Sequence, residues 1–244
     1  MCSSDLTGGN SGIGRAVAEE FKAQGAHVVI FGRNRETLDE TARSLGDGHH
    51  VVQGDVSKAA DLDRLYAEVK ERYGRVDVLV ANAGIAPMAP VGEVDEDFFD
   101  RLFQINVKGL FFTVQKAVPL FSEGASVVLV GSTVAQMGMP GMSVYGATKA
   151  AVRYFSRAFS AELLPQGVRV NTLSPGPIET PIYDRMGLAD EEKQEMAQQI
   201  TSQVPMGRFG TADEMAKAAL FLASSDSSYV VGADLLADGG FASL

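Results

Sequence analysis

The chain is poor in cysteine, in long apolar runs and in positive charge. Its single cysteine, Cys2, cannot form an internal disulfide, and this indicates a reducing compartment. No apolar run approaches the length of a membrane span, and the stretch before Thr7 has neither the basic start nor the apolar middle of a signal peptide. We therefore expect a cytoplasmic protein that has no membrane partner.

Basic residues are outnumbered, with 21 Lys and Arg against 31 Asp and Glu, and the formal net charge is −10 at pH 7. Nucleic acids and anionic membranes need a basic surface, so neither is an expected partner, and a small molecule is favoured. His49 and His50 are adjacent, but no cysteine or acidic residue stands at ligand spacing from them. We expect a solvated loop there and no metal site.

The sequence does contain a regular alternation of short apolar, β-rich runs with longer amphipathic stretches. Such alternation predicts an α/β protein with a parallel sheet and helices on both faces. The apolar runs cover residues 27–32, 51–56, 76–84, 126–132 and 168–176. No repeat or linker interrupts the pattern, so we expect one domain over residues 1–244. The polar segment 183–203 predicts a mobile helical insertion that covers the substrate.

A glycine cluster in TGGNSGIG stands directly before an amphipathic stretch. With Gly8, Gly12 and Gly14 in the loop, unhindered backbone can approach a pyrophosphate at the positive end of a helix. The spacing differs from the common G-x-G-x-x-G, and glycines also make ordinary turns. The loop alone therefore leaves a phosphate site and a plain turn as alternatives.

The first of these apolar runs, 27–32, ends in IFG and is followed by RN, where a fold that prefers NAD usually presents an acidic side chain to the ribose. Here Arg33 follows Gly32, and a guanidinium can pair with a 2′-phosphate through two charge-assisted hydrogen bonds. This favours NADP(H), with NAD(H) as the alternative cofactor. The competing interpretation is that Arg33 is a solvated residue at a helix start.

A third pattern joins Ser132, Tyr145 and Lys149. On a helix, Tyr145 and Lys149 share a face, while Ser132 ends an apolar strand, where open α/β sheets bind ligands. A free tyrosine has a pKa near ~10, and a neighbouring ammonium would lower it, so we expect a Tyr–Lys proton donor or acceptor unit. A tyrosine packed beside a solvated lysine is the alternative for the pair alone.

Together these motifs resemble the short-chain dehydrogenase/reductase family, over essentially the whole chain from Thr7 onward. TGGNSGIG resembles the family's T-G-x-x-x-G-x-G, and ANAG resembles its N-N-A-G with Ala81 in place of the first Asn. GDV at 54–56, QINVKG, SPGPIET at 174–180 and GADLLADGG at 232–240 resemble four further family segments. The resemblance implies a doubly wound Rossmann fold with about seven parallel strands.

The resemblance also implies roles for individual residues. The implied catalytic set is Asn106, Ser132, Tyr145 and Lys149, with Tyr145 as general acid or base and Asn106 holding a water of a proton relay. The implied cofactor contacts are Gly8, Ser11, Gly12, Ile13, Gly14, Arg33, Asp55, Val56, Asn82, Ala83, Gly84, Tyr145, Lys149, Ile178 and Thr180. Hydride transfer between NADP(H) and a small ketone or secondary alcohol is the expected reaction. The alternatives are a 3-oxoacyl-[acyl-carrier-protein] reductase and a non-catalytic dinucleotide-sensing protein.

The segment in front of the glycine loop does not fit the central apolar strand that the resemblance implies. Asp5 in the middle of a sheet is costly unless it is hydrogen-bonded or solvated. We expect residues 3–6 to form a shortened central strand of reduced stability. Because CSSDL is also what a common sequencing-adapter end (TGC TCT TCC GAT CT) encodes, we expect that the first six residues are not the native start. A natural variant strand is the alternative.

Two further groups of side chains carry expectations. Three methionines, Met137, Met139 and Met142, lie between Ser132 and Tyr145, and they form either an adaptable wall beside a substrate or plain packing. Aromatic residues gather around Asn106 and after Lys149, namely Phe98, Phe99, Phe103, Phe111, Phe112, Tyr154, Phe155 and Phe159. Their number suggests a helix-mediated interface, and the family resemblance implies a homotetramer.

Overall fold

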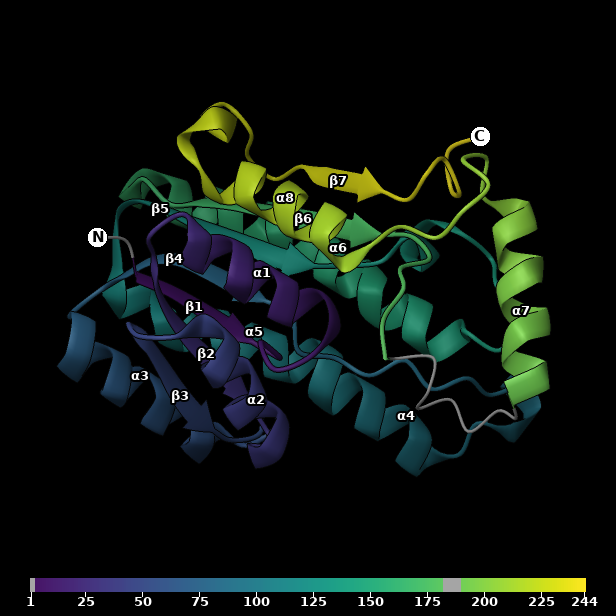
Figure 1. Ribbon diagram of the computed structural model, residues 1–244, viewed down its shortest axis with the longest axis horizontal. Helices are drawn as coiled ribbons and strands as arrows, with labels where there is room; N and C mark the ends of the chain where they lie inside the picture. The colour runs from purple at the N-terminus through teal and green to yellow at the C-terminus, as the bar shows by residue number, and fades with distance from the viewer. Residues whose placement is uncertain (1–2, 182–189) are drawn as a thin grey trace.

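A computed structural model describes residues 3–181 and 190–244, leaving aside the side chains of 190, 192 and 193. Within these residues the chain forms one parallel sheet of seven strands in the order β3-β2-β1-β4-β5-β6-β7 (Figure 1). The strands are β1 (Ser3–Thr7), β2 (His27–Gly32), β3 (His49–Gln53), β4 (Val76–Ala81), β5 (Phe121–Val130), β6 (Arg169–Pro175) and β7 (Asp234–Ala237). This confirms the predicted doubly wound α/β fold.

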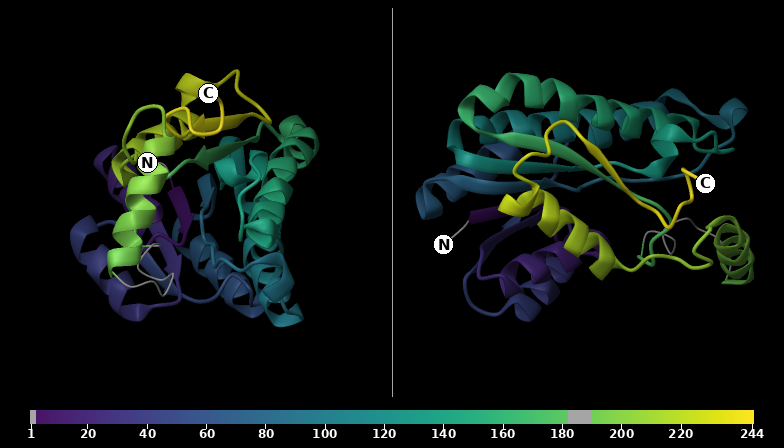
Figure 2. Two further views of the ribbon diagram at one scale, coloured as in Figure 1. Left: turned by 90° about the vertical axis from the view of Figure 1, so that its right-hand side faces the viewer. Right: turned by 90° about the horizontal axis from the view of Figure 1, so that it is seen from above.

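Helices cover both faces of the sheet (Figure 2, right). The first face carries α1 (Gly12–Ala23), α2 (Arg35–Leu45) and α8 (Ala212–Ala223). The second carries α3 (Ala59–Tyr73), α5 (Leu110–Ala117) and α6 (Ser143–Leu163). At the carboxyl ends of the strands lie α4 (Glu96–Phe103) and α7 (Asp190–Gln203) (Figure 1). No described helix is both long and apolar enough to cross a membrane.

The core consists of two apolar layers, one on each face of the sheet. Because side chains alternate along a strand, Val28 and Ile30 of β2 pack toward α1 and α8, while Val29 and Phe31 pack toward α3. A strand that is buried on both faces needs a nearly continuous run of apolar residues. For this reason the strand at 27–32 could be predicted from the sequence with its observed bounds.

Several predicted strand boundaries are wrong, and those of β3 and β5 differ most. β3 begins at His49, so His49 and His50 lie in a strand and not in the expected loop. β3 ends at Gln53, three residues before the predicted end, because Asp55 forms local hydrogen bonds in place of ladder bonds. Its Oδ1 accepts from the backbone N–H of Ser57 at 2.9 Å, and its own N–H donates to Asp61 Oδ2 at 2.9 Å. β5 begins at Phe121, five residues before the predicted start, with a register shift opposite β4 between Val76 and Val78.

β1 takes the predicted central position, but the expected shortening is wrong. All five of its residues pair with β2, and four of them also pair with β4. Asp5 is only 1% exposed, and neither carboxylate oxygen has a hydrogen-bond partner among the described residues. Its side chain shares a face with Val29 and Leu79, which lie beside it in the sheet.

The strand keeps its length because a central position satisfies backbone N–H and C=O groups whatever the side chain is. Burial, helped by the negative charge of Asp77, raises the pKa of Asp5 from 3.8 to about 8. At neutral pH the group is therefore a carboxylic acid, which costs less to bury than a carboxylate.

A π-helical turn, Gln104–Gly109, connects α4 to α5. Such turns contain one residue more than the α-helical pattern and occur often at functional sites. Here the turn points Asn106 inward, where it is 1% exposed. The sequence pattern gave no sign of this turn.

Candidate active site

The carboxyl ends of the strands surround two adjoining pockets. One pocket lies over β1, β2 and β4 and includes the glycine loop. The other lies between β5, β6 and α7 and has a volume of about 520 Å³. Asn82, Gly84 and Thr180 line both pockets, so a ligand can extend from one into the other. Ligands bind at this edge in open α/β sheets.

Most of the predicted cofactor contacts line the first pocket. They are Gly8, Ser11, Gly12, Ile13, Arg33, Asp55, Val56, Asn82, Ala83, Gly84 and Thr180. Sequence reasoning missed several neighbours in the same lining, namely Asn10, Phe31, Asn34, Ile85, Ile105 and Pro181. Asn10 and Ile105 lie inside the motifs TGGNSGIG and QINVKG, so their places in these motifs were usable signals. The others lie close to predicted residues in the chain and have no motif of their own.

The glycine loop fits a pyrophosphate. Gly12 begins α1 with φ +50°, a conformation that favours glycine, and a Cβ on Gly14 would lie 2.2 Å from the carbonyl oxygen of Gly8. Gly14 thus allows the tight turn and does not line the pocket itself. Ser11 makes no side-chain cap, and the first turn of α1 has no acidic residue, so its positive end faces the pocket uncompensated.

Thr7 and Asn82 hold the glycine loop against β4. Thr7 Oγ1 accepts from the N–H groups of Asn82 and Ala83 at 3.1 and 3.2 Å. In return, Asn82 Nδ2 donates to the carbonyl oxygens of Thr7 and Gly8, both at 3.2 Å. Thr7 was missing from the predicted site, although its place at the start of the motif was a usable signal.

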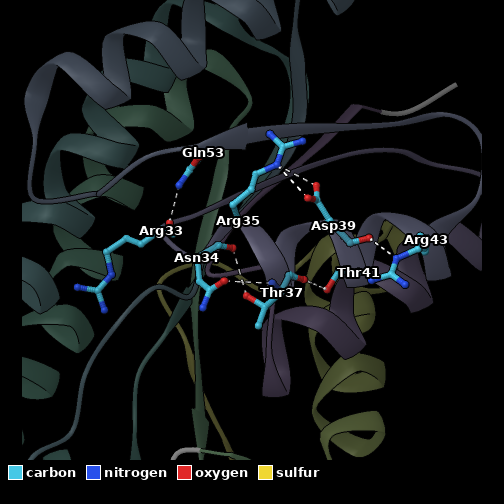
Figure 3. Close-up of polar contacts among 8 residues, drawn as sticks. All are labelled: Arg33, Asn34, Arg35, Thr37, Asp39, Thr41, Arg43 and Gln53. Carbon is cyan, nitrogen blue, oxygen red and sulfur yellow. Dashed lines mark hydrogen bonds and ion pairs between the residues drawn. The ribbon is translucent and has the colours of Figure 1, made fainter.

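Arg33 directly follows β2, while Arg35 begins α2 and Arg43 lies in the last turn of that helix (Figure 3). Of these three, only Arg33 lines the first pocket. Arg35 is held by Asp39 at 2.9 Å, and Arg43 Nε donates to the Asp39 carbonyl oxygen at 3.2 Å. The Arg33 guanidinium is 61% exposed and lies 3.9 Å from the Asp55 carboxylate. It is therefore available to an anionic ligand.

The second pocket brings together Ser132, Tyr145 and Lys149 with Ile178 and Thr180. The Ser132 and Tyr145 side chains lie close together in this pocket, and Ser132 acts to lower the pKa of Tyr145. Lys149 donates from Nζ to the carbonyl oxygen of Val130 at 2.8 Å and lies 5.8 Å from the centre of the Tyr145 ring. The residues predicted to act together are thus close in space.

The electrostatics of this pair differ from the expectation. Burial raises the pKa of Tyr145 above 10, and the nearby Ser132 hydroxyl offsets only part of this rise. The expected lowering by a neighbouring ammonium is wrong for this arrangement, because burial of the phenol outweighs it. Burial also lowers the pKa of Lys149 from 10.5 to about 8. Lys149 is charged at neutral pH but loses its proton readily.

Asn106 lines neither pocket as the described residues define them. Its Oδ1 accepts from the Ile85 N–H at 2.9 Å, and Nδ2 donates to the Ile85 carbonyl at 2.8 Å and to Thr148 Oγ1 at 3.2 Å. Gly84 lies between Asn106 and Lys149. A Cβ on Gly84 would lie 3.2 Å from Asn106 Oδ1 and 3.7 Å from Lys149 Nζ.

Several methionines line the second pocket together with Ser132 and Tyr145. The lining includes Met88, Met137, Met139, Met142 and Met196. This resolves the open alternative for the three methionines after Ser132 in favour of a pocket wall. Of the predicted covering segment, 190–203 is helical and lines the pocket through Gln199 and Ile200, among others, while 183–189 lie outside the described residues.

The aromatic residues divide between core and surface. Phe159 is buried, and Phe111 and Phe155 pack against it with ring centroids 5.4 and 5.3 Å away. Phe99 and Tyr154 are 44% and 66% exposed. Part of the aromatic excess therefore fills the core, so it is weaker support for an interface than the sequence suggested.

Comparison with known proteins places this geometry in a family. A family profile described as "Enoyl-(Acyl carrier protein) reductase" matches residues 8–242. The chain belongs to the short-chain dehydrogenase/reductase family. It is an NAD(P)-dependent oxidoreductase, and the non-catalytic alternative finds no support among its relatives.

Members of this family resemble the chain over nearly its full length. "Oxidoreductase asL5" of Sarocladium schorii is 42% identical, with 98% of this chain and 95% of that protein covered. "NADP-dependent (R)-specific alcohol dehydrogenase" of Lentilactobacillus kefiri is 35% identical, covering 97% and 94%. A crystal structure of 3-ketoacyl-(acyl-carrier-protein) reductase from Brucella melitensis complexed with NADH has a TM-score of 0.92 at 33% identity, covering 99% and 98%.

Proposed function

We propose that the protein transfers hydride between NADP(H) and a small, uncharged ketone or secondary alcohol. The observation that carries this proposal is that Ser132, Tyr145 and Lys149 lie together in the second pocket, next to the residues that it shares with the first. A carbonyl oxygen that reaches this pair meets two hydroxyl groups, and the cofactor pocket adjoins it through Gly84 and Thr180.

In the reductive direction, Tyr145 donates its phenolic proton to the carbonyl oxygen, and Ser132 donates a hydrogen bond to the same atom. When bound, the nicotinamide supplies the hydride. Lys149, held on the Val130 carbonyl, provides positive charge that stabilises the tyrosinate after proton transfer. Asn106 fixes the turn beside Lys149, and the free lone pair on its Oδ1 can hold a water that returns a proton to the pair.

The residues that would hold the cofactor fit a dinucleotide. The N-terminus of α1 receives the pyrophosphate, Asp55 and Val56 border the adenine, and Ile178 and Thr180 contact the carboxamide. Arg33, exposed and only loosely paired, reads a 2′-phosphate and gives a preference for NADP(H). The L. kefiri relative is named NADP-dependent, while the B. melitensis reductase was crystallised with NADH.

The cofactor preference is tested by fluorescence titration with NADPH and NADH. Arg33→Ala should weaken NADPH binding by at least about tenfold and leave NADH binding within about twofold, since a charge-assisted bond contributes ~1.5–3 kcal/mol. Arg35→Ala is the matched control, because Arg35 already pairs with Asp39. Equal loss of both cofactors in Arg33→Ala, or an equal loss in the control, contradicts the assignment.

Methionine side chains in the pocket wall favour apolar substituents on the carbonyl substrate, since they are flexible and adapt to irregular shapes. The alternative substrate, a 3-oxoacyl group on acyl-carrier protein, is supported by the B. melitensis reductase, and the family profile's description names the same carrier with an enoyl group. That carrier is acidic and this chain carries a net charge of −10, so we favour a free small molecule. The cytoplasmic location and the homotetramer stay predictions.

Tyr145→Phe tests the reaction itself. A positioned general acid contributes ~10²–10⁴ in rate, so turnover of a ketone panel should fall by that factor while the Kd for NADPH changes little. Tyr154→Phe is the matched control on the same helix, because Tyr154 is exposed and outside both pockets. Turnover that survives in Tyr145→Phe would show that another group donates the proton.

A further inference from the structure

Asp234 begins β7 and has a side chain that is only 7% exposed. Its Oδ1 accepts a hydrogen bond from Ser174 Oγ at 2.6 Å, and its Oδ2 accepts from Gln136 Nε2 at 3.0 Å. Arg153 completes the set, with Nε 2.8 Å from the same Oδ2. One buried carboxylate therefore accepts two hydrogen bonds and also forms an ion pair with Arg153, whose Nε lies close to it without making a hydrogen bond.

These three partners come from the segments that carry the active site. Gln136 ends the short 3₁₀ turn that follows Ser132, and Arg153 lies one helical turn after Lys149 on α6. Ser174 lies near the end of β6, directly before the segment that leads to Ile178. The carboxylate thus joins the serine, the helix with the Tyr–Lys pair, and the strand that leads to the expected carboxamide contacts.

Local packing leaves these partners little freedom. A Cβ on Gly131 would lie 2.6 Å from Ser174 Oγ, so the backbone just before Ser132 packs directly on that hydroxyl. Ser132 Oγ accepts from the N–H of Val134, which ties the serine to the turn that ends at Gln136. A shift of this turn would therefore move Ser132 and at the same time break the hydrogen bond between Gln136 and Asp234.

Resting on the proposed function, we propose that Asp234 is a positioning residue that sets the separation between Ser132 and Tyr145. It lines neither pocket as the described residues define them, so it acts through the elements it joins. A buried carboxylate that loses a donor keeps an uncompensated charge, and this makes the arrangement resistant to displacement. Small misplacements at reacting atoms are expensive in rate.

The test compares Asp234→Asn with Asp77→Asn. Asp77 is a matched control, since its carboxylate also has three polar partners, Ser3 N, Ser122 Oγ and Arg75 Nε, at 2.8, 2.6 and 3.1 Å. It lies near the amino end of β4, at the edge of the sheet away from both pockets. Both substitutions keep the side-chain shape but place an NH₂ group where a donor is bound.

In the turnover assay, Asp234→Asn should lower kcat by between about ten- and a hundredfold with the Kd for NADPH within about twofold. Asp77→Asn should lower Tm and leave kcat per folded molecule unchanged. Gln136→Leu should lower kcat less, and the double variant with Asp234→Asn should fall no further than Asp234→Asn alone. An unchanged kcat in Asp234→Asn, or an equal loss in Asp77→Asn, overturns the proposal.

Hydrogen exchange measured by mass spectrometry gives a readout that does not need turnover. Asp234→Asn should speed backbone exchange in peptides that cover residues 131–142 and 174–180, and Asp77→Asn should leave these peptides unchanged. If the wild-type protein turns over no ketone, the proposed function is wrong. The exchange measurement still tests whether Asp234 holds the segments 131–142 and 174–180 in place. Unchanged exchange in Asp234→Asn overturns the positioning role.

Discussion

Asp5 and Asp234 are both buried carboxyl groups in the same sheet, yet their surroundings are opposite. Asp5 lies in the middle of the central strand among apolar side chains and has no hydrogen-bond partner among the described residues. Asp234 lies at the start of an edge strand, accepts hydrogen bonds from Gln136 and Ser174, and forms an ion pair with Arg153. Burial alone therefore does not decide whether a carboxyl group finds partners, because its place in the sheet determines which polar groups lie within reach.

The largest expected effect is on stability, at Asp5. At pH 7 the unfolded chain carries this carboxyl ionised while the fold keeps it protonated, and this difference costs on the order of 4 kcal/mol, given its pKa of about 8 in the fold. Asp5→Val removes this cost and matches the neighbours Val29 and Leu79. We expect the free energy of unfolding in urea at pH 7 to rise by about that amount. An unchanged or lower value would show that Asp5 has a partner or reaches solvent.

The pH dependence of stability sharpens the same contrast. The pKa of Asp5 is raised in the fold, so its contribution is favourable below pH 3.8 and is lost as pH rises toward about 8. The difference in unfolding free energy between Asp5→Asn and wild type should therefore grow from pH 4 to pH 8 and then level off. A difference that does not vary with pH would contradict the raised pKa.

Lys149 adds a buried cation with one backbone acceptor to the comparison. Its pKa is lowered to about 8, so the ammonium beside Tyr145 loses its charge as pH rises through that value. We expect kcat/KM for ketone reduction to fall above about pH 8, approaching tenfold per pH unit. In Lys149→Arg the guanidinium stays charged, so this high-pH limb should disappear even if activity is lower overall.

The smallest expected effect comes from giving Asp5 a donor. Val29 lies beside Asp5 on the same face, and Val29→Thr would place a hydroxyl there. In wild type the new hydrogen bond should offset the cost of burying the hydroxyl, while in Asp5→Val the same change should destabilise by about 1–3 kcal/mol. A double-mutant cycle in urea measures this coupling, and equal effects in both backgrounds would argue against contact between the two side chains.

Local sequence patterns predicted much of the fold and of the site. The apolar run at β2, the glycines before α1 and the four-residue spacing of Tyr145 and Lys149 are each determined by neighbours in the chain. Arg33 was also found this way, because it follows directly after a strand. Such features depend on only a few consecutive residues.

The rest depends on contacts between distant segments. Gln136 and Asp234 are 98 residues apart, and only the β6–β7 register and the direction of α6 bring their network together. Polar side chains in β1 suggested a shortened strand, but pairing on both edges outweighed this preference. The raised pKa of Tyr145 likewise depends on burial, which the Tyr–Lys spacing alone does not show.

The π turn at Gln104–Gly109 makes the helical connection sensitive to length. Successive helical residues are about 100° apart around the axis, so deleting one residue here would restore a regular helix and rotate one side of it against the other. Either Asn106 would leave the interior, or the buried side of α5, with Leu110 and Val114, would turn away from the sheet. The number of residues in this turn therefore determines which way Asn106 and the buried side of α5 face, as strictly as the identity of these residues does.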